Sequence, residues 1–118
     1  AIDEHELATH SRVVIEDIIR GDIGFDGVLM SDDLSMQALS GSLGERAEKS
    51  FKAGCDLALH CNGKLDEMRD IAKNTPPLTG RALERCETAL ALQTSPSDID
   101  EKAARKELSQ LLQTSSTA

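Results

Sequence analysis

Residues 24–36 of this 118-residue chain read GFDGVLMSDDLSM. The stretch begins with a glycine-rich turn, continues as an apolar run at residues 28–30, and ends abruptly in Ser31, Asp32 and Asp33. A continuous apolar run between turn residues is typical of a buried parallel strand. In parallel α/β folds, ligands bind at the carboxyl ends of the strands, because the loops that lead into the helices converge there. The stretch therefore predicts an α/β fold with two carboxylates on its ligand-binding edge.

A helix is predicted immediately before this strand, over residues 11–20. Its apolar side chains follow the i, i+1, i+4, i+5 spacing of one helical face, namely Val14, Ile15, Ile18 and Ile19. Ser11 is a suitable N-cap for this helix, and Gly21 is a suitable residue to end it. The pattern therefore predicts a helix that leads into the strand through the turn at residues 24–27.

After the strand, the chain alternates between helix and strand once more. Ser42 and Glu45 have the spacing of a capping box, which predicts a helix within residues 34–53 that ends at Gly54. A second apolar strand is predicted over residues 56–60. Two parallel strands bury too little surface to be stable alone, so we expect another chain or an upstream region to complete the sheet.

Three helices are predicted after the second strand, over residues 64–74, over residues 79–92 and beyond Ser97. Ser97 follows a linker rich in Thr, Ser and Pro, and it is predicted to cap the last, amphipathic helix. Residues 114–118 are predicted to be a disordered tail. The chain therefore divides into an α/β segment at residues 1–93 and a C-terminal linker, helix and tail at residues 94–118.

Charge and composition argue against several classes of partner. The chain carries 21 acidic and 13 basic residues, for a net charge of −8, and it has two aromatic residues. Nucleic acids and anionic membranes are bound through basic patches, and single-stranded nucleic acids through aromatic side chains as well. No apolar run is long enough to span a bilayer, and no signal peptide begins the chain. We therefore expect neither a nucleic-acid nor a membrane partner.

The three cysteines are Cys55, Cys61 and Cys86. They are odd in number and irregularly spaced, and each lies in an apolar stretch, whereas disulfide frameworks and zinc sites have regular Cys patterns. We expect three buried thiols in a reducing compartment.

The carboxylates at the end of the first strand allow more than one function. A carboxylate in this position serves as a nucleophile, a general base or a metal ligand, and an Asp also caps the helix that follows. A Mg²⁺ site on Asp32 and Asp33 would be typical of a receiver-like domain, but such a domain has more strands than this chain. The glycine motifs that bind nucleotides, helical His pairs and closely spaced Cys pairs are absent from the sequence, so no cofactor is expected. The residues alone leave these alternatives open.

The stretch GFDGVLMSDDLSM resembles the nucleophile signature of glycoside hydrolase family 3. More narrowly, it is similar to the bacterial single-domain β-N-acetylhexosaminidases of cell-wall recycling. The sequences IIRG at residues 18–21, AGCD at residues 53–56 and HCN at residues 60–62 match the same pattern. The resemblance covers about residues 1–92, in order and at the right spacing.

This resemblance implies a fold and an activity. The fold would be the C-terminal portion of a (β/α)8 TIM barrel, about its last two βα units, followed by C-terminal helices. Members of the family are retaining glycosidases that remove terminal N-acetylglucosamine (GlcNAc) through a covalent glycosyl-enzyme, with neither a metal nor another cofactor. The resemblance identifies Asp32 as the nucleophile, GlcNAc-containing peptidoglycan fragments as substrates, and the cytoplasm as the location.

Three further residues near the strand ends have two interpretations each. Met36 and Asn62 follow the two strands and are predicted to contact the sugar, although packing for Met36 and loop termination for Asn62 are the alternatives. Asp33 is predicted to cap the next helix, with support of the site as the alternative.

The chain lacks a second motif of the family. Members carry the sequence KHFPGHG on an earlier loop, which supplies sugar contacts and the acid/base His, and this chain has no such sequence. We expect His5 and His10 to be solvated, and His60 to be a semi-buried His whose ring is hydrogen-bonded. The isolated chain is therefore predicted to be inactive. The alternative function is a non-catalytic α/β fragment that associates with the missing N-terminal barrel portion or with itself.

Overall fold

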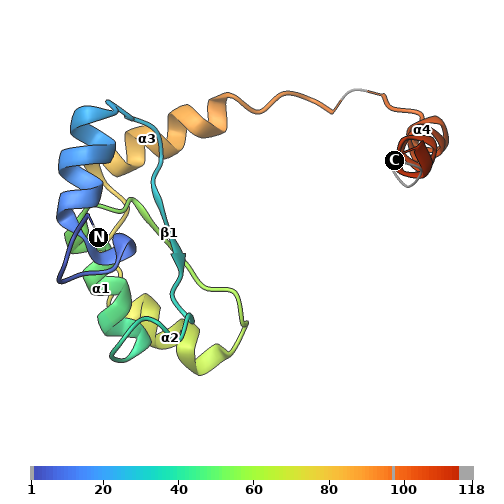
Figure 1. Cartoon of the computed structure of the whole chain (residues 1–118). Coiled ribbons are helices and arrows are strands. Elements are labelled where there is room, and N and C mark those ends of the chain that lie inside the picture. The colour runs from blue at the N-terminus through green and yellow to red at the C-terminus, as the bar shows by residue number, and fades with distance from the viewer. Residues whose placement is uncertain (1, 97, 115–118) are drawn as a thin grey trace.

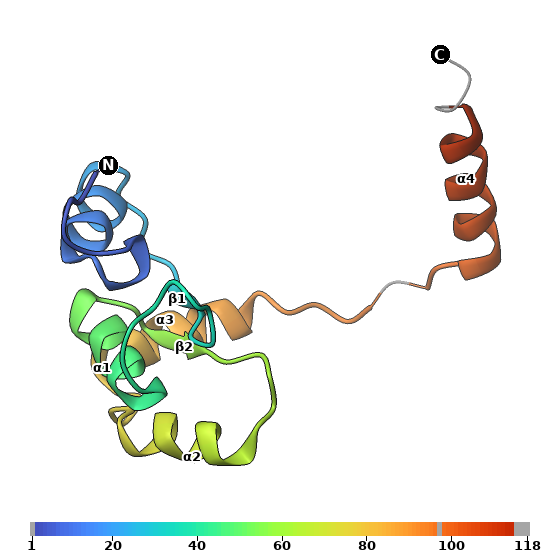
Figure 2. The ribbon, with the colours of Figure 1, turned by 60° about the horizontal axis from the view of Figure 1, so that its bottom comes forward.

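The computed structural model describes residues 2–96 and 98–114. Its elements, in chain order, are η1 (Ala8–His10), η2 (Val13–Asp22), β1 (Met30–Asp33), α1 (Leu43–Ala53), β2 (Leu57–Leu59), α2 (Leu65–Lys73), α3 (Gly80–Ala91) and α4 (Glu101–Thr114). Figure 1 shows this succession of elements along the chain, and Figure 2 shows β1 and β2 next to each other. The predicted α/β alternation is confirmed, with one additional 3-10 turn, η1, near the N-terminus.

Strands β1 and β2 pair in parallel, as predicted. Strand β1 lies later in the chain than the apolar run at residues 28–30 suggested, whereas β2 lies within the predicted residues 56–60. Met30 is opposite Leu57, and Asp33 is opposite Leu59, with an irregular register between them. The backbone ladder begins at Leu29, whose carbonyl accepts from the N–H of Asp56 at 2.8 Å. Asp32 and Asp33 therefore lie inside the strand rather than after it, because the partner strand sets where pairing stops.

Helix α1 is begun and ended by the residues that the sequence indicated. The Ser42 side chain accepts from the Glu45 N–H, and the Glu45 side chain accepts from the Ser42 N–H, which completes the capping box. Gly54 ends the helix with a φ of 115°, a left-handed conformation that favours glycine. Residues 34–42 form turns, in which the N–H of Met36 donates to the Asp33 carbonyl and that of Leu39 to the Met36 carbonyl, and the helix predicted within residues 34–53 begins at Leu43.

Helix η2 is a wide, π-type helix, in which the N–H of Ile23 donates to the carbonyl of Ile18, five residues earlier, at 2.8 Å. The Ser11 side chain accepts from the Val14 N–H at 3.1 Å, which is the capping contact predicted for it. Gly21 does not end the helix, which continues to Asp22. The chain turns instead at Gly24, which has a φ of 70°.

The buried core is small and aliphatic. One cluster contains Ile15, Ala53 and Cys55, and the other contains Leu34, Leu39 and Ala47. Of the three cysteines, only Cys55 is buried, whereas Cys86 is partly exposed and Cys61 is exposed. The prediction of three buried thiols is therefore confirmed for Cys55 alone and is wrong for Cys86, on α3, and for Cys61, on the loop after β2.

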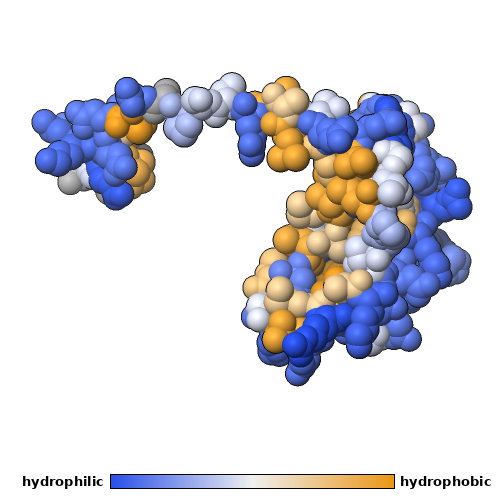
Figure 3. Space-filling view, turned by 180° about the vertical axis from the view of Figure 1, so that it is seen from behind, coloured by the Kyte–Doolittle hydropathy of each residue, from blue (hydrophilic) through white to orange (hydrophobic). Residues whose placement is uncertain are grey.

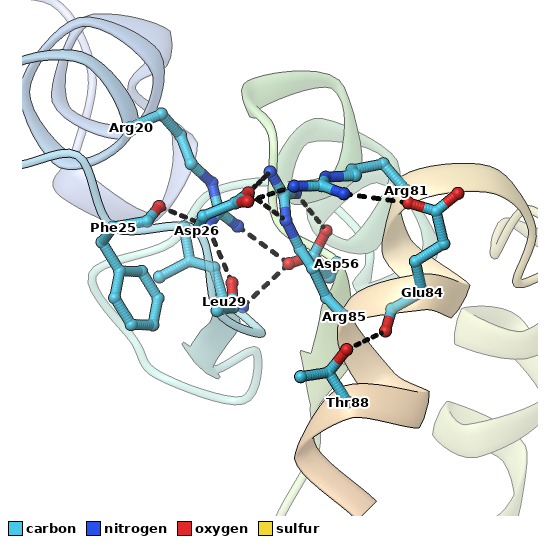
Figure 4. A network of polar contacts seen from close by, with 10 residues as sticks. Arg20, Phe25, Asp26, Leu29, Asp56, Arg81, Glu84, Arg85 and Thr88 are labelled. Atoms are coloured by element: carbon cyan, nitrogen blue, oxygen red, sulfur yellow. Dashed lines mark hydrogen bonds and ion pairs between the residues drawn. The ribbon is translucent and has the colours of Figure 1, made fainter. Parts of the chain in front are cut away.

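A network of ion pairs holds the amino-terminal ends of the strands against α3 (Figure 4). The buried Asp56 carboxylate accepts from Arg20 at 2.8 Å, from Arg85 at 3.0 Å and from the Leu29 N–H at 2.9 Å. Arg20 also donates to two carbonyls of the turn that precedes β1, at 2.8 and 2.7 Å. The network ties η2, both strands and α3 together at one point.

Helix α4 stands apart from the other elements (Figures 1 and 2). Its N-cap contacts come from Asp100, whose side chain accepts from the N–H groups of Lys102 and Ala103 at 3.0 and 3.1 Å. The predicted cap, Ser97, lies outside the described residues, as does the predicted tail beyond Thr114. No described helix has the length and apolar character needed to cross a membrane.

The chain exposes more surface than a compact domain of its size. Its radius of gyration is 19.2 Å, against about 13–14 Å for a compact domain of this length. Its accessible surface is 8816 Å², against about 6,200 Å² for a compact monomer of this mass. Figure 3 shows apolar side chains gathered on a hollowed flank of the molecule. Exposed apolar residues include Met30, Leu59, Leu83 and Leu90.

Candidate active site at the carboxyl ends of the strands

Asp32 lies near the carboxyl end of β1 with its side chain exposed. One carboxylate oxygen, Oδ1, accepts from the N–H of Asp33 at 2.8 Å, which fixes the orientation of the carboxylate. The backbone is held as well, because the Ser31 hydroxyl donates to the Asp32 carbonyl at 2.8 Å and accepts from the Leu59 N–H at 3.0 Å. The strand pairing therefore presents Asp32 to solvent on a fixed backbone.

Asp32 lines a hollow of about 160 Å³ between strand β1 and the N-terminal helices. The other lining residues are Ala8, Thr9, Val14, Ile15, Ile19, Leu29, Met30, Ser31 and Cys55. Most of this wall is apolar, and Asp32 is the acidic group in it. An exposed carboxylate that borders a hollow and has one oxygen fixed by an N–H is suited to attack as a nucleophile or to accept a proton.

Asp33 has a different set of contacts from Asp32. Its carboxylate accepts from the N–H of Ser35 at 3.0 Å, from the hydroxyl of Ser35, and from the N–H of Cys61 at 3.2 Å. The hydrogen bond from the Ser35 hydroxyl is the largest cause that holds the pKa of Asp33 below its usual value. The prediction that Asp33 caps the next helix is wrong, because α1 begins ten residues later, at Leu43. Asp33 instead closes the turn after β1 through Ser35 and links that turn to Cys61, on the loop after β2.

The two carboxylates do not share a site. Successive side chains of a strand point to opposite faces of the sheet, and Asp32 borders the hollow while Asp33 binds the adjacent loops. Within residues 2–96 and 98–114, no three His, Cys, Asp or Glu side chains converge as a metal site requires. The arrangement therefore gives no support to the Mg²⁺ receiver-like alternative.

The loop after β1 is fastened by Arg46 of α1. Its guanidinium donates to the carbonyls of Leu34 and Met36 at 2.8 and 3.0 Å, and to the Gly41 carbonyl at 3.1 Å. The Met36 side chain packs against the core cluster that contains Leu34, which agrees with the packing interpretation of this residue. Contact of Met36 with a sugar stays a prediction.

Asn62 lies on the loop after β2 and is exposed. Its side-chain oxygen accepts from the Lys64 N–H at 3.0 Å, and its side-chain nitrogen donates to Glu67. These contacts close the loop before α2. Contact of Asn62 with a sugar is likewise a prediction that the structure leaves open.

The three histidines have different surroundings. His5 is exposed, as predicted. His10 is partly buried rather than solvated, with Nε2 3.1 Å from the Arg46 carbonyl, and burial is the main reason why its pKa is lowered. The His60 side chain is buried, but neither ring nitrogen has a hydrogen-bond partner among the described residues. The prediction of a hydrogen-bonded His60 is therefore wrong.

Two residues near the site were missed by reasoning from the sequence. Ser31 joins the two strands through its hydroxyl, and Glu67 binds the loop that contains Asn62. Ser31 directly precedes Asp32 in the stretch GFDGVLMSDDLSM, so its place in the sequence could have marked it as part of the site. Glu67 belongs to a charged helix of ordinary composition, and no pattern distinguishes it from its neighbours.

Comparison with known proteins identifies the family. Residues 1–88 match the glycosyl hydrolase family 3 N terminal domain. A β-hexosaminidase of Chromobacterium violaceum is 42% identical over 89 residues, which are 74% of this chain and 25% of that protein. One from Bordetella avium is 40% identical over 82 residues, or 66% of this chain and 23% of that protein. One from Neisseria gonorrhoeae is 49% identical over 67 residues, or 53% of this chain and 19% of that protein.

The chain thus spans about a quarter or less of the length of these relatives. The family match nevertheless includes both strands, Asp32 and the helices packed around them. It also includes 88 of the 118 residues. On this basis, the chain that presents Asp32 at the end of a parallel strand belongs to glycosyl hydrolase family 3.

Proposed function

We propose that this chain is the part of a retaining exo-β-N-acetylglucosaminidase that carries the nucleophile, Asp32. The observation that carries the proposal is the position of Asp32: an exposed carboxylate near the carboxyl end of a parallel strand, inside the region that matches the family. In parallel α/β enzymes, catalytic groups stand at this end of the strands. The related proteins bear the name β-hexosaminidase, which is consistent with this reaction.

The proposed reaction takes place in two steps. An oxygen of the Asp32 carboxylate attacks the anomeric carbon and forms an ester bond, while the bond to the leaving oxygen breaks and an acid outside this chain protonates that oxygen. Water then attacks the same carbon, gives its proton to the conjugate base of that acid, and releases Asp32 as a carboxylate. The N–H of Asp33 at 2.8 Å would orient the nucleophile in both steps.

The proposed substrates are GlcNAc-containing peptidoglycan fragments, and the proposed location is the cytoplasm. Met36 and Asn62 lie on the loops that follow Asp32 and β2, and we assign them sugar contacts in this scheme. The chemistry needs neither a metal ion nor another cofactor, because the carboxylate itself is the nucleophile.

The proposed architecture is the C-terminal portion of a (β/α)8 TIM barrel, whose partner is the remainder of the barrel. Such a barrel has about 250 residues and eight strands, whereas β1 and β2 are the strands of the described residues. The exposed apolar flank and the large radius of gyration support association with a second body of this kind (Figure 3). Self-association would cover the same surface and is the alternative.

Activity in a reconstituted complex tests the proposal. The whole chain is co-expressed with the part of the Chromobacterium violaceum β-hexosaminidase that precedes the segment it matches, and release of a chromophore from an aryl β-GlcNAc is measured. We expect activity in the complex and none in the chain alone. Asp32→Asn should lower kcat by at least about 10³-fold, whereas Asp66→Asn, on the exposed face of α2, should not change it.

Chemical rescue distinguishes a nucleophile from a structural carboxylate. In an Asp32→Gly complex, added formate or azide should restore turnover, and azide should yield the α-glycosyl azide, because the small anion attacks in place of the side chain. A folded complex with no activity, or an Asp32→Asn complex with full activity, would refute the glycosidase proposal. If the complex folds but is inactive, the chain is instead a non-catalytic fragment that associates with a partner.

A further inference from the structure

His60 occupies an unusual position beside the candidate active site. It follows strand β2, and its side chain is only 8% exposed. Its Nε2 lies 3.3 Å from Glu67 Oε2, and its Nδ1 lies 4.0 Å from Asp33 Oδ1. Neither approach has the geometry of a hydrogen bond, so both ring nitrogens are buried without a hydrogen-bond partner among the described residues, although a carboxylate lies near each. A buried polar group without a hydrogen bond costs about 1–3 kcal/mol of folding free energy, so such groups are rare in folded proteins and often have a functional role.

Each carboxylate beside His60 is anchored to a different loop. Asp33 is bound by Ser35 and by the N–H of Cys61, and so belongs to the turn after β1. Glu67 is bound by Asn62 and, at 3.2 Å, by Lys64 Nζ, and so belongs to the loop before α2. The ring therefore stands between two loops that leave the same edge of the sheet.

Both carboxylates are held in the ionised form. Hydrogen bonds from Ser35 and from Asn62 are the largest causes that lower the pKa of Asp33 and of Glu67, respectively, and His60 contributes to both shifts. The charged groups that face the ring are thus two anions, together with the Lys64 ammonium bound to one of them.

Asp33 connects His60 to the nucleophile. The backbone N–H of Asp33 is the donor that fixes Asp32 Oδ1 at 2.8 Å. The contacts that hold the Asp33 side chain in the turn after β1 restrict the residue that supplies this N–H. Misplacement of a reacting group by about 1 Å lowers a rate by on the order of 10²-fold.

We infer that His60 is a positioning residue for Asp32: its ring bridges Asp33 and Glu67, joins the two loops, and thereby fixes the N–H that orients the nucleophile. The inference rests on the proposed function of Asp32. The ring is buried, and in this inference it acts through Asp33.

The first test uses the chain by itself and needs no activity. The backbone amide resonance of Asp33 and the side-chain carboxyl resonance of Asp32 are recorded by NMR. His60→Phe keeps a ring of similar shape but removes both nitrogens, so both resonances should shift, whereas His60→Gln, which keeps a donor, should restore most of the original positions. His5→Phe, at an exposed histidine, is the matched control and should change neither resonance.

The second test measures rates in the reconstituted complex. His60→Phe should lower kcat by roughly 10-fold or more with KM within twofold, since it is the orientation of the nucleophile that is lost. His60→Gln should recover most of kcat. A folded His60→Phe chain with unchanged Asp32 and Asp33 resonances, or a complex with unchanged kcat, would overturn the inference. If the unsubstituted complex is inactive, the proposed function fails, and the NMR result still decides whether His60 holds Asp33 and Asp32 in place.

Discussion

Asp56→Asn is expected to lower the free energy of unfolding by about 3 kcal/mol. The side chain of Asp56 is 5% exposed, and those of its partners Arg20 and Arg85 are 10% and 17% exposed. Removing one member of a buried ion pair costs about 3–5 kcal/mol, because the charge left behind is neither paired nor solvated. Asparagine keeps an oxygen that can accept from the Leu29 N–H, and Arg20 keeps its two carbonyl partners, so we expect the lower end of this range.

Urea unfolding followed by circular dichroism measures this change. The slope of unfolding free energy with urea is about 1–3 kcal/mol per molar for small proteins, so a loss of about 3 kcal/mol moves the midpoint down by about 1–3 M. Asp26→Asn is the matched control, because Asp26 pairs with Arg81 and Arg85 but is 57% exposed. Exposed pairs contribute at most about 1 kcal/mol and are weakened by salt.

A loss of less than 1 kcal/mol in Asp56→Asn, or a loss equal to that in Asp26→Asn, would refute the reasoning. Either result would mean that water, the turn carbonyls bound by Arg20 and the Asp26 carboxylate bound by Arg85 satisfy the two charges without Asp56. The Asp56→Asn loss should also be nearly independent of added salt, because the buried pair is shielded from counterions.

Three further predictions follow from titratable groups. Ser35→Ala should raise the pKa of Asp33 in a carboxyl NMR titration, because the Ser35 hydroxyl is the chief cause that lowers it; an unchanged pKa would contradict this. The folded-state pKa of His10 is depressed by burial, so the unfolded chain binds the proton more tightly, and the urea midpoint should fall as the pH drops below about 6.5. His10→Gln should lose less stability over the same interval, and an equal loss would contradict the assignment. The pKa values of Cys61 and Cys55 are both raised, chiefly by burial, but Cys61 is exposed whereas Cys55 is buried with a pKa of about 11, so iodoacetamide at pH 8 should modify Cys61 before Cys55, as followed by mass spectrometry. Equal rates for the two thiols would show that Cys55 is accessible.

The features that the sequence predicted correctly depend on neighbours in the chain. The Ser42 and Glu45 capping box and the Gly54 stop require contacts over a few residues only, and all three form as expected. The bounds of β1 were predicted less well, because the pairing of Leu29 with Asp56 fixes them across the sheet. An apolar run indicates that a strand exists, but its partner decides where it begins and ends.

The same distinction applies to the candidate site. The position of Asp32 at a strand end follows from the local pattern and from the family resemblance. The contacts of Asp33 do not, because Cys61, 28 residues further on, supplies one of its donors. The burial of His60 between two carboxylates also depends on how the loops fold back, and no spacing in the sequence encodes it.

The two ends of the small sheet are built in opposite ways. At the amino-terminal end, each oxygen of the buried Asp56 carboxylate is bound by an arginine, and one of them also accepts a backbone N–H (Figure 4). At the carboxyl end, Asp32 is exposed and the nitrogens of His60 are unpaired among the described residues. A satisfied, buried network stabilises a fold, whereas an exposed carboxylate such as Asp32 is free to meet a ligand. In parallel α/β enzymes, stability resides at the amino-terminal face and chemistry at the carboxyl face, and the polar contacts of this chain follow the same division.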